Sequence, residues 1–278
     1  MKMKTLFLFF CVVLCSGITA GQTLKVMTYN IRLDLSSDSS NAWPNRKELV
    51  LDVIRFYEPA IFGVQEALPH QMQYLDSALP NFAFVGMGRD GGQQGEFSAL
   101  FYNKNRFSVF EQATFWLSET PDVAGKGWDA AFPRICTHAL FLDKETQQIF
   151  WVFNLHLDHV GEKARLKSVK LVQQRIAKLN NDGLPVILMG DFNASPDNEV
   201  IKWVSGFMKN TRDCSVFNYG TAATFNGFRF DEPPTQCIDY IFVSPGAFTV
   251  EKHAVINDSN GGRYPSDHFP VLVELRFN

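Results

Sequence analysis

The sequence predicts an α/β (α+β) fold, a four-layer α/β/β/α sandwich in which two packed, mostly antiparallel β-sheets are flanked by helices. Two observations support this prediction. Strand-like segments outnumber helical ones, and several strands follow each other without a helix between them, as in "PRICTHALFL" and "QIFWVFNLHLDH" at residues 133–159. Because parallel neighbours need a long crossover connection, this order excludes a wholly parallel sheet.

The spacing of apolar residues predicts the individual elements. Short alternating or continuous apolar runs indicate strands, and apolar residues at helical spacing indicate helices. In the first expected helix, for example, Leu49, Val50, Val53, Ile54 and Tyr57 share one face. We expect strands at residues 24–32, 60–66, within 82–117, 133–142, 148–159, 184–193, 237–244, 248–256 and 268–277, and helices at 45–57, 70–79, 162–181 and 199–204.

The first 20 residues have the layout of a secretory signal peptide. Lys2 and Lys4 form a basic start, residues 5–15 are apolar, and small residues follow up to Ala20. The apolar stretch is too short for a stable membrane anchor. We therefore expect an exported protein, periplasmic or extracellular, whose mature chain of residues 21–278 is a single domain without a transmembrane anchor.

Composition limits the partners and the metals. Loss of the two signal-peptide lysines would change the formal net charge from −3 to −5 (−3 − 2). A mildly acidic chain offers no broad basic face for polyanions. Three cysteines remain, Cys136, Cys214 and Cys237, and they allow at most one disulfide. Their spacing lacks the clustered Cys/His pattern of a zinc site.

Polar side chains recur at the ends of the expected strands. By their spacing of two, Asp191 and Asn193 are expected on one strand face, and so are Asn154, His156 and Asp158. Asp239 lies inside the apolar run "CIDYIF", where a buried acid needs a partner. Each such residue alone fits a helix cap, a turn or a structural role. Their recurrence at six strands favours one polar site at the rim of the sandwich. The residues are Asn30, Glu66, Asn154, His156, Asp158, Asp191, Asn193, Asp239, Asp267 and His268.

Taken in order, the motifs identify a family. They are "TYNIR", "QE", "GEFSALFY", "NLHLDH", "GDFNASPD", "IDYIFVS" and "SDHFPV", spread from residue 28 to residue 271. The chain resembles the endonuclease/exonuclease/phosphatase superfamily, which includes deoxyribonucleases, neutral sphingomyelinases, inositol polyphosphate phosphatases and deadenylases. The motifs are most similar to those of the deadenylase-like branch, and bacterial exported relatives share them.

The resemblance implies a metal site and an attacking water. Glu66 matches the main metal carboxylate of the family, with Asn30 and Asp267 beside it. Asp191 matches the acid that orients or deprotonates the water, and His268 matches the essential imidazole. Such hard oxygen ligands suit Mg²⁺, with Mn²⁺ as the alternative.

The resemblance also implies residues around the phosphate. Asp239 matches the carboxylate that orients His268, and Asn193 matches the amide that holds the phosphate. His156 occupies a phosphate-contacting position, and Glu96 resembles the acid that supports His156.

Four further residues are candidates for substrate binding. Asn154, Asp158 and His159 lie close to His156 in the sequence, and Arg134 lies in a neighbouring expected strand. A structural ion pair between Arg134 and a nearby acid fits the sequence equally well.

The expected function is metal-dependent hydrolysis of a phosphoester by attack of water on phosphorus. The substrate stays open between nucleic acid, phospholipid and a small phosphorylated metabolite such as a sugar or inositol phosphate. The aromatic residues within 225–230 form either an exposed apolar surface that binds lipid or part of the core. No stable protein partner is implied. The alternative is an exported, catalytically inactive protein that binds a phospholigand or glycan, although the full set of motifs argues against it.

Overall fold

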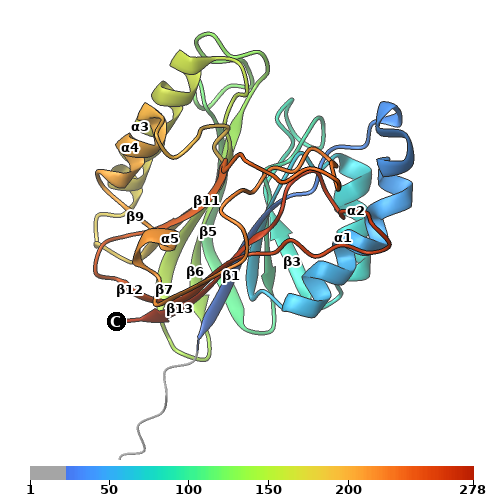
Figure 1. Cartoon of the computed structure of the whole chain (residues 1–278). Coiled ribbons are helices and arrows are strands. Elements are labelled where there is room, and N and C mark those ends of the chain that lie inside the picture. The colour runs from blue at the N-terminus through green and yellow to red at the C-terminus, as the bar shows by residue number, and fades with distance from the viewer. Residues whose placement is uncertain (1–22) are drawn as a thin grey trace, which may run out of the picture.

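The computed structural model describes residues 23–278, which form β-strands and helices arranged in layers (Figure 1). The strands are β1 (Leu24–Asn30), β2 (Ile61–Gln65), β3 (Phe82–Val85), β4 (Leu100–Asn103), β5 (Phe107–Trp116), β6 (Ile135–Asp143), β7 (Ile149–His156), β8 (Val186–Asp191), β9 (Lys209–Asn210), β10 (Phe217–Tyr219), β11 (Asp239–Val243), β12 (Phe248–Val255) and β13 (Val271–Phe277). The helices are η1, a 3₁₀ helix (Ser36–Asn41), α1 (Trp43–Tyr57), α2 (Pro69–Ala78), α3 (Glu162–Leu179), α4 (Glu199–Ser205) and α5 (Thr211–Cys214).

The strands form two sheets that pack face to face. One has seven strands in the order β10-β12-β13-β1-β2-β4-β3, and the other has six in the order β5-β6-β7-β8-β11-β9. The pairs β1–β2, β7–β8 and β10–β12 are parallel, and the other neighbouring strands are antiparallel. Helices α1 and α2 lie on one outer side and α3 and α4 on the other (Figure 1). The predicted four-layer sandwich is confirmed.

Three apolar layers hold this sandwich together. Phe141 and Phe150 are fully buried between the two sheets. Val50 of α1 and Leu75 of α2 pack on the outer face of the seven-stranded sheet. Val169 of α3 packs on the outer face of the six-stranded sheet. Each large apolar side chain buried in this way contributes about 1.5–3 kcal/mol, so the apolar faces predicted from the sequence account for the layering.

The two parallel strand pairs at the centre of the sandwich determine where polar residues meet. In the seven-stranded sheet, Asn30 at the end of β1 lies beside Gln65 at the end of β2. In the six-stranded sheet, His156 at the end of β7 lies beside Asp191 at the end of β8. Because the sheets pack face to face, the carboxyl ends of all four strands open at one edge of the molecule.

The expected elements are present, with boundaries that differ by a few residues. The sequence pattern missed the short elements η1, β9, β10 and α5 because they have no apolar periodicity of their own. The last strand was expected to begin at His268 but begins at Val271. The amide of Phe269 donates to the carbonyl of Thr224, and Pro270 has no amide hydrogen, so pairing with the sheet starts only after them.

Two more sequence-based details need correction. Asp239 is the first residue of β11 and not an internal one, and it lies opposite Asp191. Asp191 and Asn193 do not share a strand face, because β8 ends at Asp191 and Asn193 has a left-handed backbone (φ 46°).

The signal-peptide prediction falls outside the described residues. Within residues 23–278, Cys136, Cys214 and Cys237 are free thiols, so the disulfide that the sequence allowed does not form. In the same range, no helix is both long and apolar enough to cross a membrane.

His138 is a buried histidine whose protonation opposes folding. Its ring lies among those of Phe115, Trp151 and Phe153, at centroid distances of 5.9, 5.7 and 5.2 Å. Burial, together with the nearby charge of Arg175, lowers its pKa to about 4. The unfolded chain therefore binds this proton more readily, and the stabilisation present above pH 6.5 is lost as the pH falls toward 4.

We expect His138→Phe to make stability less dependent on pH in the acid range. Wild-type unfolding free energy should fall between about pH 6.5 and 4.5 by up to about 1.4 kcal/mol per pH unit from this group. The variant keeps the aromatic packing but lacks the titrating ring, so its slope should be shallower. Urea unfolding at several pH values measures both slopes. Equal slopes for the two proteins would contradict the assignment.

Candidate active site

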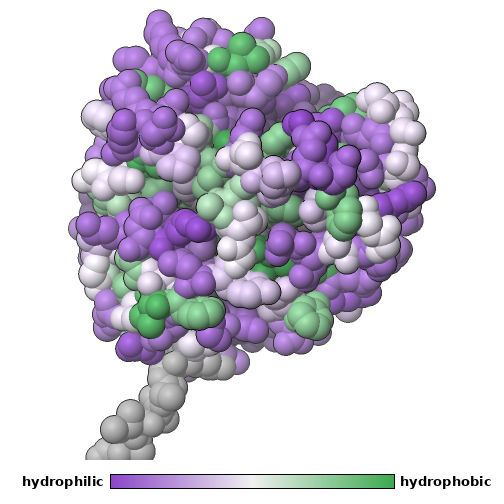
Figure 2. All heavy atoms as spheres, in the orientation of Figure 1, coloured by the Kyte–Doolittle hydropathy of each residue, from purple (hydrophilic) through white to green (hydrophobic). Residues whose placement is uncertain are grey.

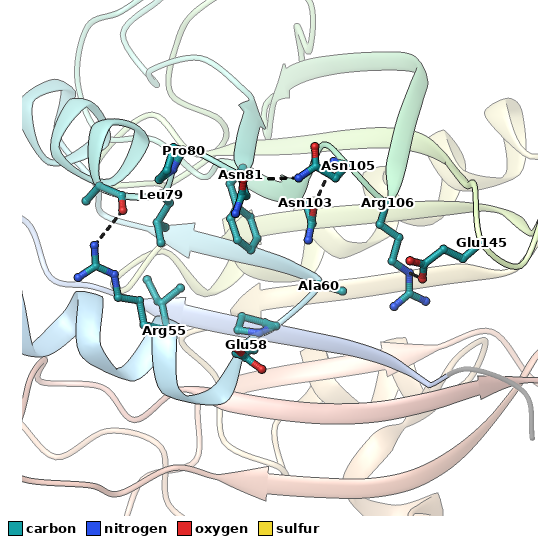
Figure 3. Close-up of a pocket in the computed structure, with 14 residues that line it drawn as sticks. Arg55, Glu58, Ala60, Leu79, Pro80, Asn81, Asn103, Asn105, Arg106 and Glu145 are labelled. Atoms are coloured by element: carbon teal, nitrogen blue, oxygen red, sulfur yellow. Dashed lines mark hydrogen bonds and ion pairs between the residues drawn. The ribbon is translucent and has the colours of Figure 1, made fainter.

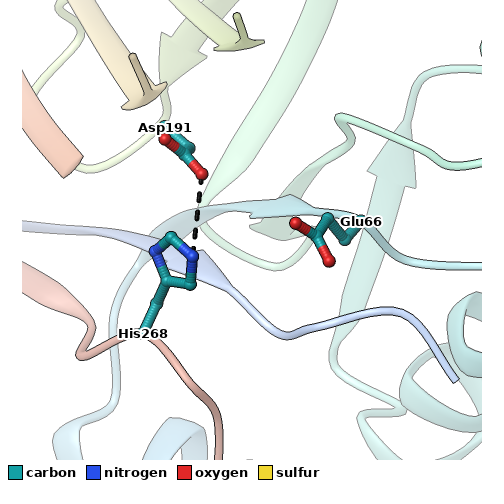
Figure 4. A group of neighbouring side chains, drawn as sticks. All are labelled: Glu66, Asp191 and His268. Carbon is teal, nitrogen blue, oxygen red and sulfur yellow. Dashed lines mark ion pairs between the residues drawn. The ribbon is translucent and has the colours of Figure 1, made fainter. Parts of the chain in front are cut away.

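Two carboxylates and an imidazole lie together at the edge where the four central strands end. One ligand atom each of Glu66, Asp191 and His268 lies within 4.8 Å of the other two (Figure 4). Glu66 follows β2, Asp191 ends β8, and His268 precedes β13, so both sheets contribute. Glu66 has a left-handed backbone (φ 63°), a conformation that is uncommon for a non-glycine residue and is enriched at functional sites.

The side chain of Asn30 connects these carboxylates across the two sheets. Its Nδ2 donates to Oε1 of Glu66 and to Oδ2 of Asp191, both at 3.0 Å. Its Oδ1 accepts from the backbone amide of Arg32 at 3.0 Å. The amide nitrogen thus faces the carboxylates. In this structure Asn30 positions the two acids, and its role as a direct metal ligand stays a prediction.

His268 is held in a positively charged form. Its Nδ1 lies 2.9 Å from Oδ2 of Asp239, and its Nε2 lies 3.8 Å from Oδ2 of Asp191. Burial alone would lower the pKa of His268, but the hydrogen bond and charge of Asp239, with Asp191 and Asp267 nearby, raise it well above the usual value. The imidazolium can therefore offer its Nε2 proton to an anion in the site.

His156 is held in the opposite, neutral form. Nη1 of Arg134 lies 3.0 and 3.1 Å from its two ring nitrogens, and Nδ2 of Asn193 lies 3.1 Å from its Nε2. Burial lowers the pKa of His156 well below the usual value, and the charges of Arg134 and His268 lower it further. The site thus combines one charged and one neutral imidazole, a separation typical of acid–base sites.

Two of the carboxyl groups have raised pKa values. Burial and the charge of Asp239 raise the pKa of Asp191 to about 7. Burial raises the pKa of Asp267, and the charge of Glu66 raises it further. This repulsion among buried acids is what a divalent cation relieves, and oxygen atoms of Glu66, Asp267 and Asp191 are the donors that Mg²⁺ and Mn²⁺ prefer. The residues present therefore fit such an ion.

A cavity of about 600 Å³ opens over these groups. Arg32, Arg89, Arg134 and His159 supply polar groups to its walls, and Leu33, Leu35, Phe132, Phe225 and Ile238 supply apolar ones. A slightly larger cavity, of about 660 Å³, lies at the opposite end of the sheets (Figure 3). There Arg55 donates to the carbonyl of Ala78, and Arg106 pairs with Asp143 and Glu145. Cavity size alone therefore does not identify the active site. The titratable groups do.

The structure brings together most of the residues predicted from the sequence. Glu96 lines the same cavity, but Arg89 is its ion-pair partner, with 2.8 Å between Oε1 and Nη2. The hydrogen-bond partners of His156 are Arg134 and Asn193, so the expected support of His156 by Glu96 is not what this geometry shows.

Asn154 was expected near the substrate but lies behind the cavity wall. It is fully buried between the sheets, where its Nδ2 donates to the carbonyls of Val64 and Ala99 and its Oδ1 accepts from Gln65. Gly63 leaves room for it, since a Cβ there would lie 2.6 Å from Cγ of Asn154. Its amide is satisfied by protein groups, which favours a structural role.

Asp158 was likewise expected near the substrate. Only 1% exposed, it accepts from four backbone amides between residues 131 and 161 and from Nε of Arg134 at 3.3 Å. Arg134 therefore makes the structural ion pair that the sequence allowed. It also lines the cavity, where its Nη2 lies 3.0 Å from Nδ1 of His159, and its role in substrate binding stays a prediction.

Sequence reasoning missed three residues that shape the site. Arg32 and Arg89 line the cavity, and Arg46 is almost fully buried beneath it. Arg46 donates to the carbonyls of Ile31, Arg32, Leu33, Asn41 and Pro265, and so ties the loop after β1 to the loop before β13. The position of Arg32 directly after Asn30 in "TYNIR" is a weak signal, whereas Arg46 lies in a helical pattern and gives none.

A cluster of carboxylates and imidazole at the rim of a two-sheet sandwich fits the class of metal-dependent hydrolases, and comparison with known proteins agrees. Residues 27–268 match the model of the Endonuclease/Exonuclease/phosphatase family. The chain belongs to this family. Its members are metal-dependent phosphoester hydrolases, and the protein is an enzyme of that class.

Three known proteins are similar to this chain. A solved endonuclease/exonuclease/phosphatase family protein of Bacteroides thetaiotaomicron is 40% identical, covers 93% of this chain and 99% of its own, and superposes with a TM-score of 0.89. A mannosyl-6-phosphatase of the same bacterium is 40% identical, with coverage of 91% and 100% and a TM-score of 0.87. An uncharacterized protein of Acanthamoeba polyphaga mimivirus is 32% identical over 61% of this chain and 67% of its own.

We expect Asn30→Asp to destabilise the protein strongly when a chelator is present. The substitution replaces the shared amide donor with a further buried carboxylate beside Glu66 and Asp191, and an uncompensated buried charge costs about 3–5 kcal/mol. Thermal unfolding in EDTA measures the effect. Saturating Mn²⁺ should restore part of the lost stability. An unchanged melting temperature in EDTA would show that Asn30 does not hold the two acids together.

Proposed function

We propose that the protein is an exported, Mg²⁺-dependent phosphomonoesterase that removes phosphate from a phosphorylated sugar. The observation that carries the proposal is the 40% identity to the mannosyl-6-phosphatase, which extends over the whole length of that chain. The cavity of about 600 Å³ supports it, since sites for small molecules typically measure about 300–1,000 Å³. The mildly acidic chain, with a formal net charge of −3, favours a small substrate over a nucleic acid.

In this proposal Asp191 is the general base. Its Oδ2 is fixed by Asn30 at 3.0 Å and lies 3.5 Å from Nε2 of His156. A pKa raised to about 7 by burial and Asp239 allows the carboxylate to accept a proton from water near neutral pH. A base placed in this way contributes about 10²- to 10⁴-fold to the rate.

The other side chains hold the phosphate. His268, charged through Asp239, donates from Nε2 to a phosphate oxygen. Asn193 lines the same cavity, and its Nδ2 would donate to the phosphate in place of its contact with Nε2 of His156 at 3.1 Å. Glu66 and Asp267 would hold Mg²⁺, which supplies neutralisation of charge on the phosphate and on the leaving oxygen when bound. Arg134 adds a fixed positive charge to the cavity wall next to His156.

The aromatic segment near the site does not favour a lipid substrate. The ring of Phe225 packs edge-on against His268 at 5.0 Å, and Phe228 packs against Arg46 at 5.7 Å, whereas Phe230 is 48% exposed beside Tyr264. On the face seen in Figure 2, hydrophobic residues form small separate areas among hydrophilic ones. Phe225 of this segment therefore forms part of the cavity wall. A membrane-binding surface would need a broader exposed apolar area.

We expect Glu66→Ala, Asp191→Ala and His268→Ala each to reduce turnover by about a hundredfold or more. A positioned base or a charge-stabilising group contributes a factor of this size to the rate. Folding should survive, as judged by circular dichroism, because each side chain lies at the rim of the sandwich. A folded His268→Ala enzyme with near-normal turnover would rule out this assignment. A folded wild-type protein without turnover on any ester would favour the alternative of an inactive binding protein.

The substrate class is tested by comparing esters. p-Nitrophenyl phosphate, bis(p-nitrophenyl) phosphate and mannose 6-phosphate are offered with Mg²⁺, with Mn²⁺ and with chelator. We expect release of phosphate from both monoesters, loss of activity in chelator, and slower hydrolysis of the diester. A diester cleaved faster than either monoester would replace the phosphatase proposal with a nuclease or lipid phosphodiesterase.

Export rests on the sequence of the first 20 residues alone. We propose cleavage after Ala20, and the support is the basic start and the apolar stretch before it. Expression of the full chain in a bacterial host, followed by fractionation and mass measurement, tests this. A mature protein that begins at Gly21 outside the cytoplasm agrees with the proposal, and an unprocessed cytoplasmic chain contradicts it.

A further inference from the structure

Arg32 is a cation placed among the acids that fit a metal ion. Its Nη1 lies 3.9 Å from Oε2 of Glu66, and its Nε lies 3.7 Å from Oδ2 of Asp267. These two acids are the ones expected to hold the divalent ion. The guanidinium therefore provides, in part, the positive charge that the ion would provide.

The position of Arg32 is built into the fold. Its side chain is paired with both carboxylate oxygens of Asp38, Nε–Oδ2 at 3.0 Å and Nη2–Oδ1 at 3.1 Å. Its backbone has φ 58°, and its carbonyl accepts from Nη2 of Arg46 at 2.7 Å and Nε2 of Gln71 at 2.9 Å. A backbone and a side chain that are both held leave little freedom for the guanidinium to move far from the acids.

Asp38 also limits how closely Arg32 approaches the acids. Arg32 lies closer to Asp38, at 3.0 Å, than to Glu66, at 3.9 Å, or to Asp267, at 3.7 Å. Arg32 is thus shared between Asp38 on one side and the two expected metal carboxylates on the other. A guanidinium at this distance lowers the repulsion between the carboxylates and also repels an incoming dication.

We propose that Arg32 is a resident counter-charge that stabilises the carboxylate cluster without metal and weakens the affinity of the site for a divalent cation, with Asp38 setting the strength of both effects. The inference concerns the metal site of the proposed function and not its substrate. It is therefore tested by measurements of metal binding and stability. The counter-charge proposal can fail while the phosphatase proposal stands, and the phosphatase proposal can fail while the counter-charge proposal stands.

The test uses Mn²⁺ titration calorimetry on the full mature chain. Arg32→Gln removes the charge but keeps a polar side chain, so we expect binding of Mn²⁺ to become about tenfold tighter or more. Arg32→Lys keeps the charge and should bind Mn²⁺ within about twofold of wild type. Arg276→Gln is the matched control, because Arg276 also pairs with an acid, Glu251 at 3.0 Å, but on the distant part of β13.

A second substitution separates charge from structure. Asp38→Asn frees Arg32 from its bidentate partner and allows closer contact with Glu66 and Asp267, so Mn²⁺ binding should weaken. Opposite shifts for Arg32→Gln and Asp38→Asn support the proposal. If Arg32 only supported the loop after β1, both substitutions would weaken binding, and this result would overturn the proposal, as would unchanged affinity in Arg32→Gln.

Stability in chelator provides an independent readout. In EDTA, Arg32→Gln should melt at a lower temperature than wild type, because the carboxylates lose their counter-charge. Saturating Mn²⁺ should raise its melting temperature by more than it raises that of the wild type, since the tighter complex gives the larger stabilisation. An Arg32→Gln protein that gains less from Mn²⁺ than the wild type would also overturn the proposal.

Discussion

The amide of Asn30 donates to one carboxylate from each sheet, and the geometry of the site depends on this shared contact. Glu66 follows a strand of the seven-stranded sheet, and Asp191 ends a strand of the six-stranded sheet. Backbone pairing within one sheet therefore does not fix the distance between the two acids. Hydrogen bonds to charged groups contribute about 1.5–3 kcal/mol each, and here they also hold two like charges close together. The stacking of the sheets is thereby coupled to the spacing of the two carboxylates.

Around this contact, the protein balances buried charge with fixed counter-charges. Asp239 keeps His268 charged, Arg134 and burial keep His156 neutral, and Arg32 lies between Asp38 and the expected metal carboxylates. Buried charges are costly unless paired, so this arrangement needs several elements to meet at one rim. The same pairs shift the pKa values of the two imidazoles in opposite directions, upward for His268 and downward for His156.

The sequence was a good guide where a local pattern was enough. Apolar periodicity gave the layers, and polar residues at strand ends gave Glu66, Asp191 and His268, which the structure brings within ligand distance. It was a poor guide to how far along a strand the core extends. Asn154 and His156 are two residues apart on β7 and so share a strand face, yet only His156 lies at the open end, while Asn154 fills the space beside a glycine between the sheets.

By itself, then, the sequence determined the four layers, the strand ends that carry acids, and the family to which the motifs belong, because these depend on residue order and short-range periodicity. Only the tertiary structure decided the pairing of Glu96 with Arg89 in place of His156, the burial of Arg46 under the loops, and the approach of Arg32 to the acids. The contacts of Arg46 with Pro265 and of Arg32 with Asp267 join segments that are distant in the chain. No local pattern encodes that geometry, since it follows from the pairing of β1 with β2 and β13 in one sheet, and left-handed backbone at Arg32 and Glu66 then sets the directions of their side chains.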